Sequence, residues 1–125
     1  MKCLHIITPV KDSIDSTLET VKAIMESDIL VPFTYTVYND FSTEENTHRL
    51  EEAARQWNFR LVNLSDLTDH PSPNYLLVLQ TAQKEAIEAD AGLLIVESDV
   101  IVKKNTLHHY TMEHCNRNNA ELQQL

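Results

Sequence analysis

The chain has 125 residues, a net charge of −9 and a single glycine. This length is enough for one domain spanning residues 1–125, and a hydrophobic content of 42% is typical of a soluble globular protein. The negative charge would repel nucleic acid and anionic membranes, and no apolar run is long enough to cross a bilayer. One glycine excludes the glycine-rich phosphate loops, and two cysteines without paired spacing favour a reduced, cytoplasmic protein.

The chain begins with a strand pattern followed by a helix pattern. Residues 4–8 predict a strand that Pro9 ends. Asp12 or Ser13 can cap the helix after this strand, since both side chains accept hydrogen bonds from backbone N–H groups. The apolar stripe of this helix has spacings of four, three and four, and consists of Ile14, Leu18, Val21 and Met25.

A second strand and a second helix come next. Residues 33–38 are aromatic and β-branched, which predicts a strand. Ser42 and Glu45 have the spacing of a capping box, which predicts that a helix begins there. The inward face of this helix would carry Leu50, Ala53, Ala54 and Trp57.

The pattern continues with a third strand over residues 59–64 and a loop over residues 65–73. A helix comes after this loop, and Gly92 stands where a C-cap would end it. Its predicted inward residues are Leu76, Leu79, Gln83, Ala86 and Ile87.

Residues 93–96 are four consecutive apolar residues, which predict a strand buried on both faces. Beyond it, residues 106–114 predict a short helix capped by Asn105, and residues 116–125 are polar.

Repeated strand–helix units predict a three-layer α/β/α domain with a mostly parallel central sheet, in the strand order 3-2-1-4. The carboxyl ends of parallel strands lie at one edge of the sheet, where open α/β folds bind ligands. We therefore expect Thr8 and Pro9, Asp40, and the acids Glu97 and Asp99 to meet at this edge.

Glu97 and Asp99 emerge directly from the buried strand at residues 93–96. Carboxylates in such a place need a partner, and a hard divalent cation that carries substrate phosphates is one. The alternative is that both acids only begin a solvated turn, with Asp99 as a cap for the next segment.

Three segments resemble family 2 inverting glycosyltransferases. The segment 35–44, YTVYNDFSTE, resembles the Val-Asp-Asp-Gly-Ser-Thr-Asp element that ends the second strand of that family. The segment 6–10, IITPV, looks like its first strand and Pro-containing nucleotide loop, and the segment 95–100, IVESDV, like its Asp-x-Asp element. The resemblance implies the Rossmann-like first half of a glycosyltransferase-A fold, which binds a nucleotide-diphosphate sugar.

The resemblance also implies roles for single residues. Asp40 matches the acid that holds the base, and Thr8 and Pro9 match the loop beside the base and ribose. Asp99 matches the acid that binds a divalent metal, Mn or Mg, and Glu97 matches the acid near ribose and metal. This sequence departs from the family where Phe41 replaces a glycine and where Lys11-Asp12 replaces Tyr-Asn.

The family's catalytic base and acceptor site belong to a second half. We therefore expect this chain to be the donor-binding half of a longer protein, truncated at its C-terminal end. It would bind the donor without transferring sugar to the acceptor, whose identity is unknown, and could self-associate through the open edge.

Other interpretations remain open. The domain could be a non-catalytic α/β module that binds a nucleotide or a protein, or an unrelated α/β domain whose acids are structural. Asp40 could be a plain turn residue. Residues 66–70 hold two acids and a histidine that most simply solvate a loop, and the histidines at 108, 109 and 114 lack metal-ligand spacing.

Overall fold

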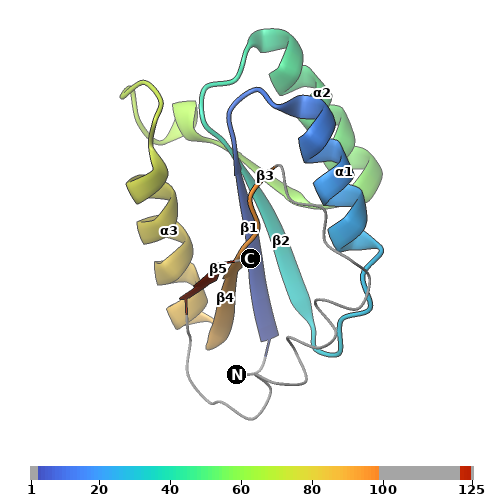
Figure 1. Cartoon of the computed structure of the whole chain (residues 1–125). Helices are drawn as coiled ribbons and strands as arrows, with labels where there is room; N and C mark the ends of the chain where they lie inside the picture. The colour runs from blue at the N-terminus through green and yellow to red at the C-terminus, as the bar shows by residue number, and fades with distance from the viewer. Residues whose placement is uncertain (1–2, 99–121, 125) are drawn as a thin grey trace.

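The computed structural model describes residues 3–98 and 122–124. These residues contain a parallel five-stranded sheet in the order β3-β2-β1-β4-β5 (Figure 1). The strands are β1 (Cys3–Val10), β2 (Phe33–Asn39), β3 (Arg60–Asn63), β4 (Ala91–Ile95) and β5 (Leu122–Gln124). The predicted order 3-2-1-4 of the first four strands is therefore confirmed, and β5 adds an edge strand that the polar segment 116–125 did not predict.

The helices cover both faces of the sheet, which gives the predicted three layers. Helices α1 (Ile14–Met25) and α2 (Glu44–Trp57) lie on one face, and α3 (Tyr75–Glu88) lies on the other (Figure 1). A short 3₁₀ turn, η1 (Leu64–Asp66), comes after β3. Among the described residues, no helix is long and apolar enough to cross a membrane.

Side chains of the central strand alternate between two cores. Leu4 and Ile6 of β1 pack on the α1–α2 side, whereas Ile7 packs on the α3 side, and all three are fully buried. This alternation follows from the two-residue period of a strand. Burial on both faces explains why residues 93–96, which begin within β4, read as a continuous apolar run.

The sequence predicted that Pro9 ends the first strand, and this prediction is wrong, because β1 continues to Val10. The carbonyl of Ile7 accepts a hydrogen bond from Val96, so Ile7 and Pro9 present their backbone polar groups to the β4 side. The register of β4 ends opposite Ile7, so the missing N–H of Pro9 faces no strand partner.

The N-cap of α1 is Ser13, one of the two predicted residues, whereas the N-cap of α2 is shifted by one residue. Thr43, not Ser42, is the N-cap of α2, and its side chain accepts a hydrogen bond from the Asn46 N–H. Ser13 occupies the N-cap of α1 without a side-chain cap bond. The carboxylate of Asp12 accepts instead from the Thr43 N–H at 2.7 Å, so it supports the N-cap residue of the neighbouring helix.

The buried face of α3 is only in part the predicted one: Ala86 is buried and Leu79 is partly buried, as expected, but the rest of the stripe is different. Its buried residues have a four-residue spacing and are Val78, Ala82 and Ala86. Leu76 and Ile87 are 67% and 62% exposed. Gly92 is not a C-cap, because it lies inside β4, and Asp90, with φ of 52°, takes the left-handed position after the helix. The helix predicted at 106–114 lies outside the described residues.

Candidate functional site

A cavity of about 230 Å³ opens at the carboxyl edge of the sheet, beside the ends of β1, β2 and β4. It brings together three of the predicted site residues, which are far apart in the sequence: Pro9, Asp40 and Glu97. The remaining lining residues are Val10, Lys11, Ser72, Pro73, Tyr75 and Val78. The convergence follows from the parallel sheet, which delivers these strand ends to a single edge.

Asp40 is a firmly held carboxylate of this cavity, with an exposed fraction of only 8%. Its Oδ2 accepts hydrogen bonds from the Ser72 hydroxyl at 2.9 Å and from the Asn74 N–H at 2.8 Å. Its Oδ1 accepts from the Asn74 side-chain amide at 2.9 Å. Asp40 therefore ties the end of β2 to the segment that leads into α3.

The turn after Asp40 uses an unusual backbone conformation. Phe41, at the position where the resemblance expects glycine, has a φ of 61°. A non-glycine residue in this left-handed region costs about 1–2 kcal/mol. Asn39 supports the turn, since its Oδ1 accepts from the Ser42 N–H and its amide donates to Thr47 and Asn63.

Lys11 is the cation among the residues lining this cavity. Its Nζ donates to the carbonyl of Phe41 at 3.1 Å and lies 3.8 Å from a carboxylate oxygen of Asp12. The pKa of Asp12 is lowered, chiefly by the hydrogen bond from the backbone N–H of Thr43. Lys11 therefore brings a positive charge to the rim of a cavity that also contains Asp40 and Glu97.

Glu97 is half-buried just beyond β4. The Tyr75 hydroxyl donates to its Oε1 over a long distance of 3.5 Å. Desolvation, followed by the negative charge of Glu97, raises the pKa of the Tyr75 hydroxyl. Two carboxylates against one ammonium leave the cavity lining negative, so a diphosphate would need an additional cation there.

Thr8 takes a different place from the other predicted site residues. It is fully buried, does not line the cavity, and its Oγ1 accepts a hydrogen bond from the Tyr35 hydroxyl at 2.7 Å. Burial raises the pKa of this tyrosine well above its usual range. The Thr8 side chain thus satisfies a buried tyrosine on the α1–α2 side.

The described residues contain no group of three or more His, Cys, Asp or Glu side chains that could hold a metal ion. Asp99, the predicted metal ligand, lies outside the described residues. Its predicted neighbour Glu97 is a carboxylate at the correct edge of the sheet, which is the donor type that Mg²⁺ and Mn²⁺ prefer.

Sequence reasoning did not assign Ser72 or Tyr75 to the site. Ser72 stands in a Pro-containing loop, where a serine commonly serves a turn, and Tyr75 begins a helix. The signal that could have found them is the topology itself, since the loop before α3 must return over the end of β2. Asp66, Asp69 and His70 are exposed, as expected for loop residues.

Comparison with solved structures supports the fold. A crystal structure of S. aureus TarS 1-349 aligns with a TM-score of 0.66 and 23% identity over 92% of this chain and 33% of that chain. A structure of S. aureus TarS gives 0.65 and 24% over 92% and 20%, and TarS 1-349 in complex with UDP-GlcNAc gives 0.61 and 23% over 92% and 32%. No protein-family model and no curated protein matches the sequence.

TarS is a glycosyltransferase, and this chain spans about a third or less of each of these three TarS chains. An identity below 25% establishes similarity of fold alone. The chain therefore has the α/β, Rossmann-like fold of one part of the glycosyltransferase TarS.

Proposed function

We propose that this chain is the donor-binding part of a glycosyltransferase and that a nucleotide-diphosphate sugar binds in the carboxyl-edge cavity. The observation that carries this proposal is the convergence of Pro9, Asp40 and Glu97 around one cavity, in a fold shared with TarS. One of the similar TarS structures is a complex with UDP-GlcNAc, which makes this compound the natural first probe.

Asp40 has the chemistry to hold the base or the ribose. A carboxylate has about four acceptor positions, and the loop donors of Ser72 and Asn74 use three of them. The fourth, on Oδ1, can accept a hydrogen bond from a base N–H or a ribose hydroxyl. Because the acceptor is charged, such a bond would be stronger than a neutral one.

A divalent ion, Mn²⁺ or Mg²⁺, is part of the proposal. Glu97 and Asp99 would hold it, and the metal would act as a Lewis acid toward the departing nucleoside diphosphate. Lys11, which also lines the cavity, would add a positive charge. These cations offset the negative lining and the chain's net charge of −9.

The resemblance to family 2 suggests an inverting transfer, in which an acceptor hydroxyl attacks the anomeric carbon directly. Such a reaction needs a general base within hydrogen-bond reach of that hydroxyl, opposite the leaving phosphate. Glu97 and Asp99 would lie on the leaving-group side as metal ligands. The base and the acceptor site would then belong to other parts of a longer protein.

Calorimetric titration of UDP-GlcNAc, with manganese or with a chelator, tests this proposal. We expect binding to weaken at least tenfold in the chelator, and the same loss in Asp99→Asn with manganese present. Asp90→Asn is a matched control, because Asp90 is exposed at the end of α3 and asparagine tolerates its left-handed backbone. Equal affinity with metal and with chelator would refute the metal-dependent site.

A second candidate is a non-catalytic domain that binds a protein rather than a nucleotide, in which Asp40 is purely structural. The observation that favours it is that most acceptor positions of Asp40 are already used within the chain. In that case UDP-GlcNAc would not bind at all, whereas both UDP and UDP-GlcNAc would bind if the donor site is real.

A further inference from the structure

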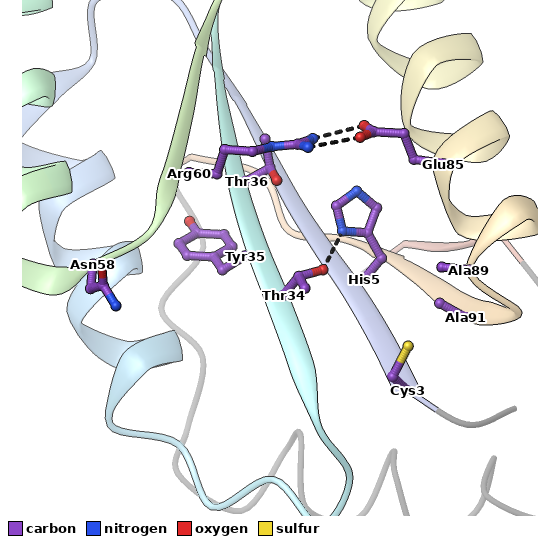
Figure 2. Close-up of a pocket in the computed structure, with 10 residues that line it drawn as sticks. All are labelled: Cys3, His5, Thr34, Tyr35, Thr36, Asn58, Arg60, Glu85, Ala89 and Ala91. Carbon is purple, nitrogen blue, oxygen red and sulfur yellow. Dashed lines mark hydrogen bonds and ion pairs between the residues drawn. The ribbon is translucent and has the colours of Figure 1, made fainter.

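A second and larger cavity lies near the amino ends of the strands, on the α3 side of the sheet (Figure 2). Its volume is about 370 Å³, within the range of pockets that hold small molecules. Its polar walls come from β1, β2, β3 and α3 and include His5, Thr34, Thr36, Arg60 and Glu85. It shares no lining residue with the carboxyl-edge cavity.

Small side chains leave the room for this cavity. Ala89 and Ala91 line it where α3 ends and β4 begins, and Cys3 lines it at the start of β1. Of these three residues, Ala91 is 1% exposed. The result is an apolar floor beside a few polar groups, which is the usual composition of a ligand pocket.

His5, which lines this cavity, carries a buried polar atom without a hydrogen-bond partner. The residue is 6% exposed, and its Nδ1 is hydrogen-bonded to the Thr34 hydroxyl at 2.7 Å. Among the described residues, Nε2 of His5 is the buried side-chain nitrogen or oxygen without a hydrogen-bond partner. Figure 2 shows this edge of the ring turned away from Thr34 and toward Arg60 and Glu85. Buried polar atoms are almost always hydrogen-bonded, so we expect Nε2 of His5 to form a hydrogen bond with a bound molecule.

The charged groups of the cavity balance each other. Arg60 holds Glu85 through two hydrogen bonds of 2.7 Å, and the Tyr38 hydroxyl donates to the same carboxylate at 3.1 Å. This pair carries no net charge, and burial lowers the pKa of His5, which favours its neutral form. A charged ligand would therefore find no counter-ion without breaking the pair.

We propose that this cavity binds a small, uncharged heteroaromatic molecule through a hydrogen bond to Nε2 of His5. The apolar floor suits a flat ring, and the planar guanidinium of Arg60 offers a surface on which such a ring can stack. The hydrogen-bond direction depends on the imidazole tautomer. If Nδ1 donates to Thr34, Nε2 accepts from the ligand, and if Thr34 donates to Nδ1, Nε2 donates to it.

Two probes of similar size distinguish these directions. Indole offers a single N–H donor, and quinoline offers a single ring-nitrogen acceptor. N-methylindole is the matched control for indole because it retains the ring and lacks the donor. Each is titrated into the isotope-labelled chain near neutral pH, and the imidazole nitrogens of His5 are followed by NMR.

We expect saturable binding of indole or quinoline, with a shift of the Nε2 resonance, and at least tenfold weaker binding to His5→Phe. Phenylalanine keeps the ring volume and removes the orphan nitrogen, so the fold should be retained. His48→Phe makes the same change on exposed α2 and should bind as the original chain does. If indole is the tighter probe, N-methylindole should bind at least tenfold more weakly than indole.

Three results would overturn the proposal. They are equal binding to His5→Phe, the same loss in His48→Phe, and no Nε2 shift by either probe up to millimolar concentration. The last result would mean that the cavity holds only water.

Discussion

The Asp40 side chain holds the loop before α3 through hydrogen bonds from Ser72 and Asn74, and it also lines the carboxyl-edge cavity. Its place at the end of the second strand could be predicted from the sequence, because an acid after an apolar run marks a strand end. The hydrogen-bond partners of Asp40 could not be predicted from the sequence. Ser72 and Asn74 are separated from it by 32 and 34 residues, and their approach depends on how the loop packs.

Replacing Asp40 by asparagine should lower the free energy of unfolding by about 1–3 kcal/mol. The amide nitrogen of asparagine cannot accept the bonds that Ser72 and Asn74 donate, so a buried donor loses its partner. Ser72→Ala removes one donor only and should cost about 1 kcal/mol. Urea unfolding measures both, and an Asp40→Asn chain as stable as the original would contradict the described geometry.

His5 predicts a pH dependence of stability. Burial lowers the pKa of its imidazole from the usual 6.5, while Glu85 of α3 raises it and Arg60 of β3 lowers it. The unfolded chain therefore takes up this proton at a higher pH than the folded chain does. The stabilising contribution is present above about pH 6.5 and is lost as the pH falls below it.

The free energy of unfolding should thus decrease between about pH 7 and pH 5, and His5→Phe should reduce this slope. Glu85 would not mask the effect, because hydrogen bonds from Arg60 lower its pKa below the usual 4.5. Urea titrations at several pH values provide the measurement, with His48→Phe as the control. An identical slope in His5→Phe would exclude His5 as its source.

At the scale of single elements, the local sequence predicts where a helix begins, but it does not predict which side chain caps the helix. The start of α2 was predicted to within one residue, but the capping side chain was Thr43 rather than Ser42. Ser42 Oγ accepts instead from the Asp12 N–H at 2.8 Å. This contact joins two loops 30 residues apart, which no local pattern contains.

Thr43→Ala should destabilise the fold by about 0.5–2 kcal/mol, because the Asn46 N–H loses its cap. Ser13→Ala is the matched variant, since Ser13 occupies the N-cap of α1 without a side-chain cap bond. It should have a much smaller effect. Thermal unfolding compares the two, and equal losses would show that the cap of α2 contributes nothing specific.

Helix α3 was predicted as an element, but its orientation was not. Leu76 and Val78 are both apolar, and periodicity alone cannot decide which stripe faces the sheet. We expect Val78→Ala to cost about 1.5–3 kcal/mol, since Val78 is 1% exposed, and Leu76→Ala at 67% exposed to stay within about 0.5 kcal/mol. The reverse order in urea unfolding would mean that α3 is rotated.

At the scale of the whole molecule, the order of β3-β2-β1-β4 followed from strand–helix alternation and right-handed crossovers. The same rules brought Pro9, Asp40 and Glu97 to one edge. They could not reveal β5, whose pairing with β4 depends on a polar segment far along the chain. Nor could they reveal the His5 cavity, which exists because small residues lie where α3 ends.

The central claim is that a nucleotide-diphosphate sugar binds at the carboxyl edge of the sheet. The most direct test is to titrate UDP-GlcNAc with magnesium, which is diamagnetic, into the isotope-labelled chain and to map the backbone amide shifts by NMR. The account predicts saturable shifts at Val10, Lys11, Asp40 and Glu97, with Cys3, His5 and Arg60 unaffected. Shifts confined to the cavity around His5, or no saturable shifts at all, would contradict it.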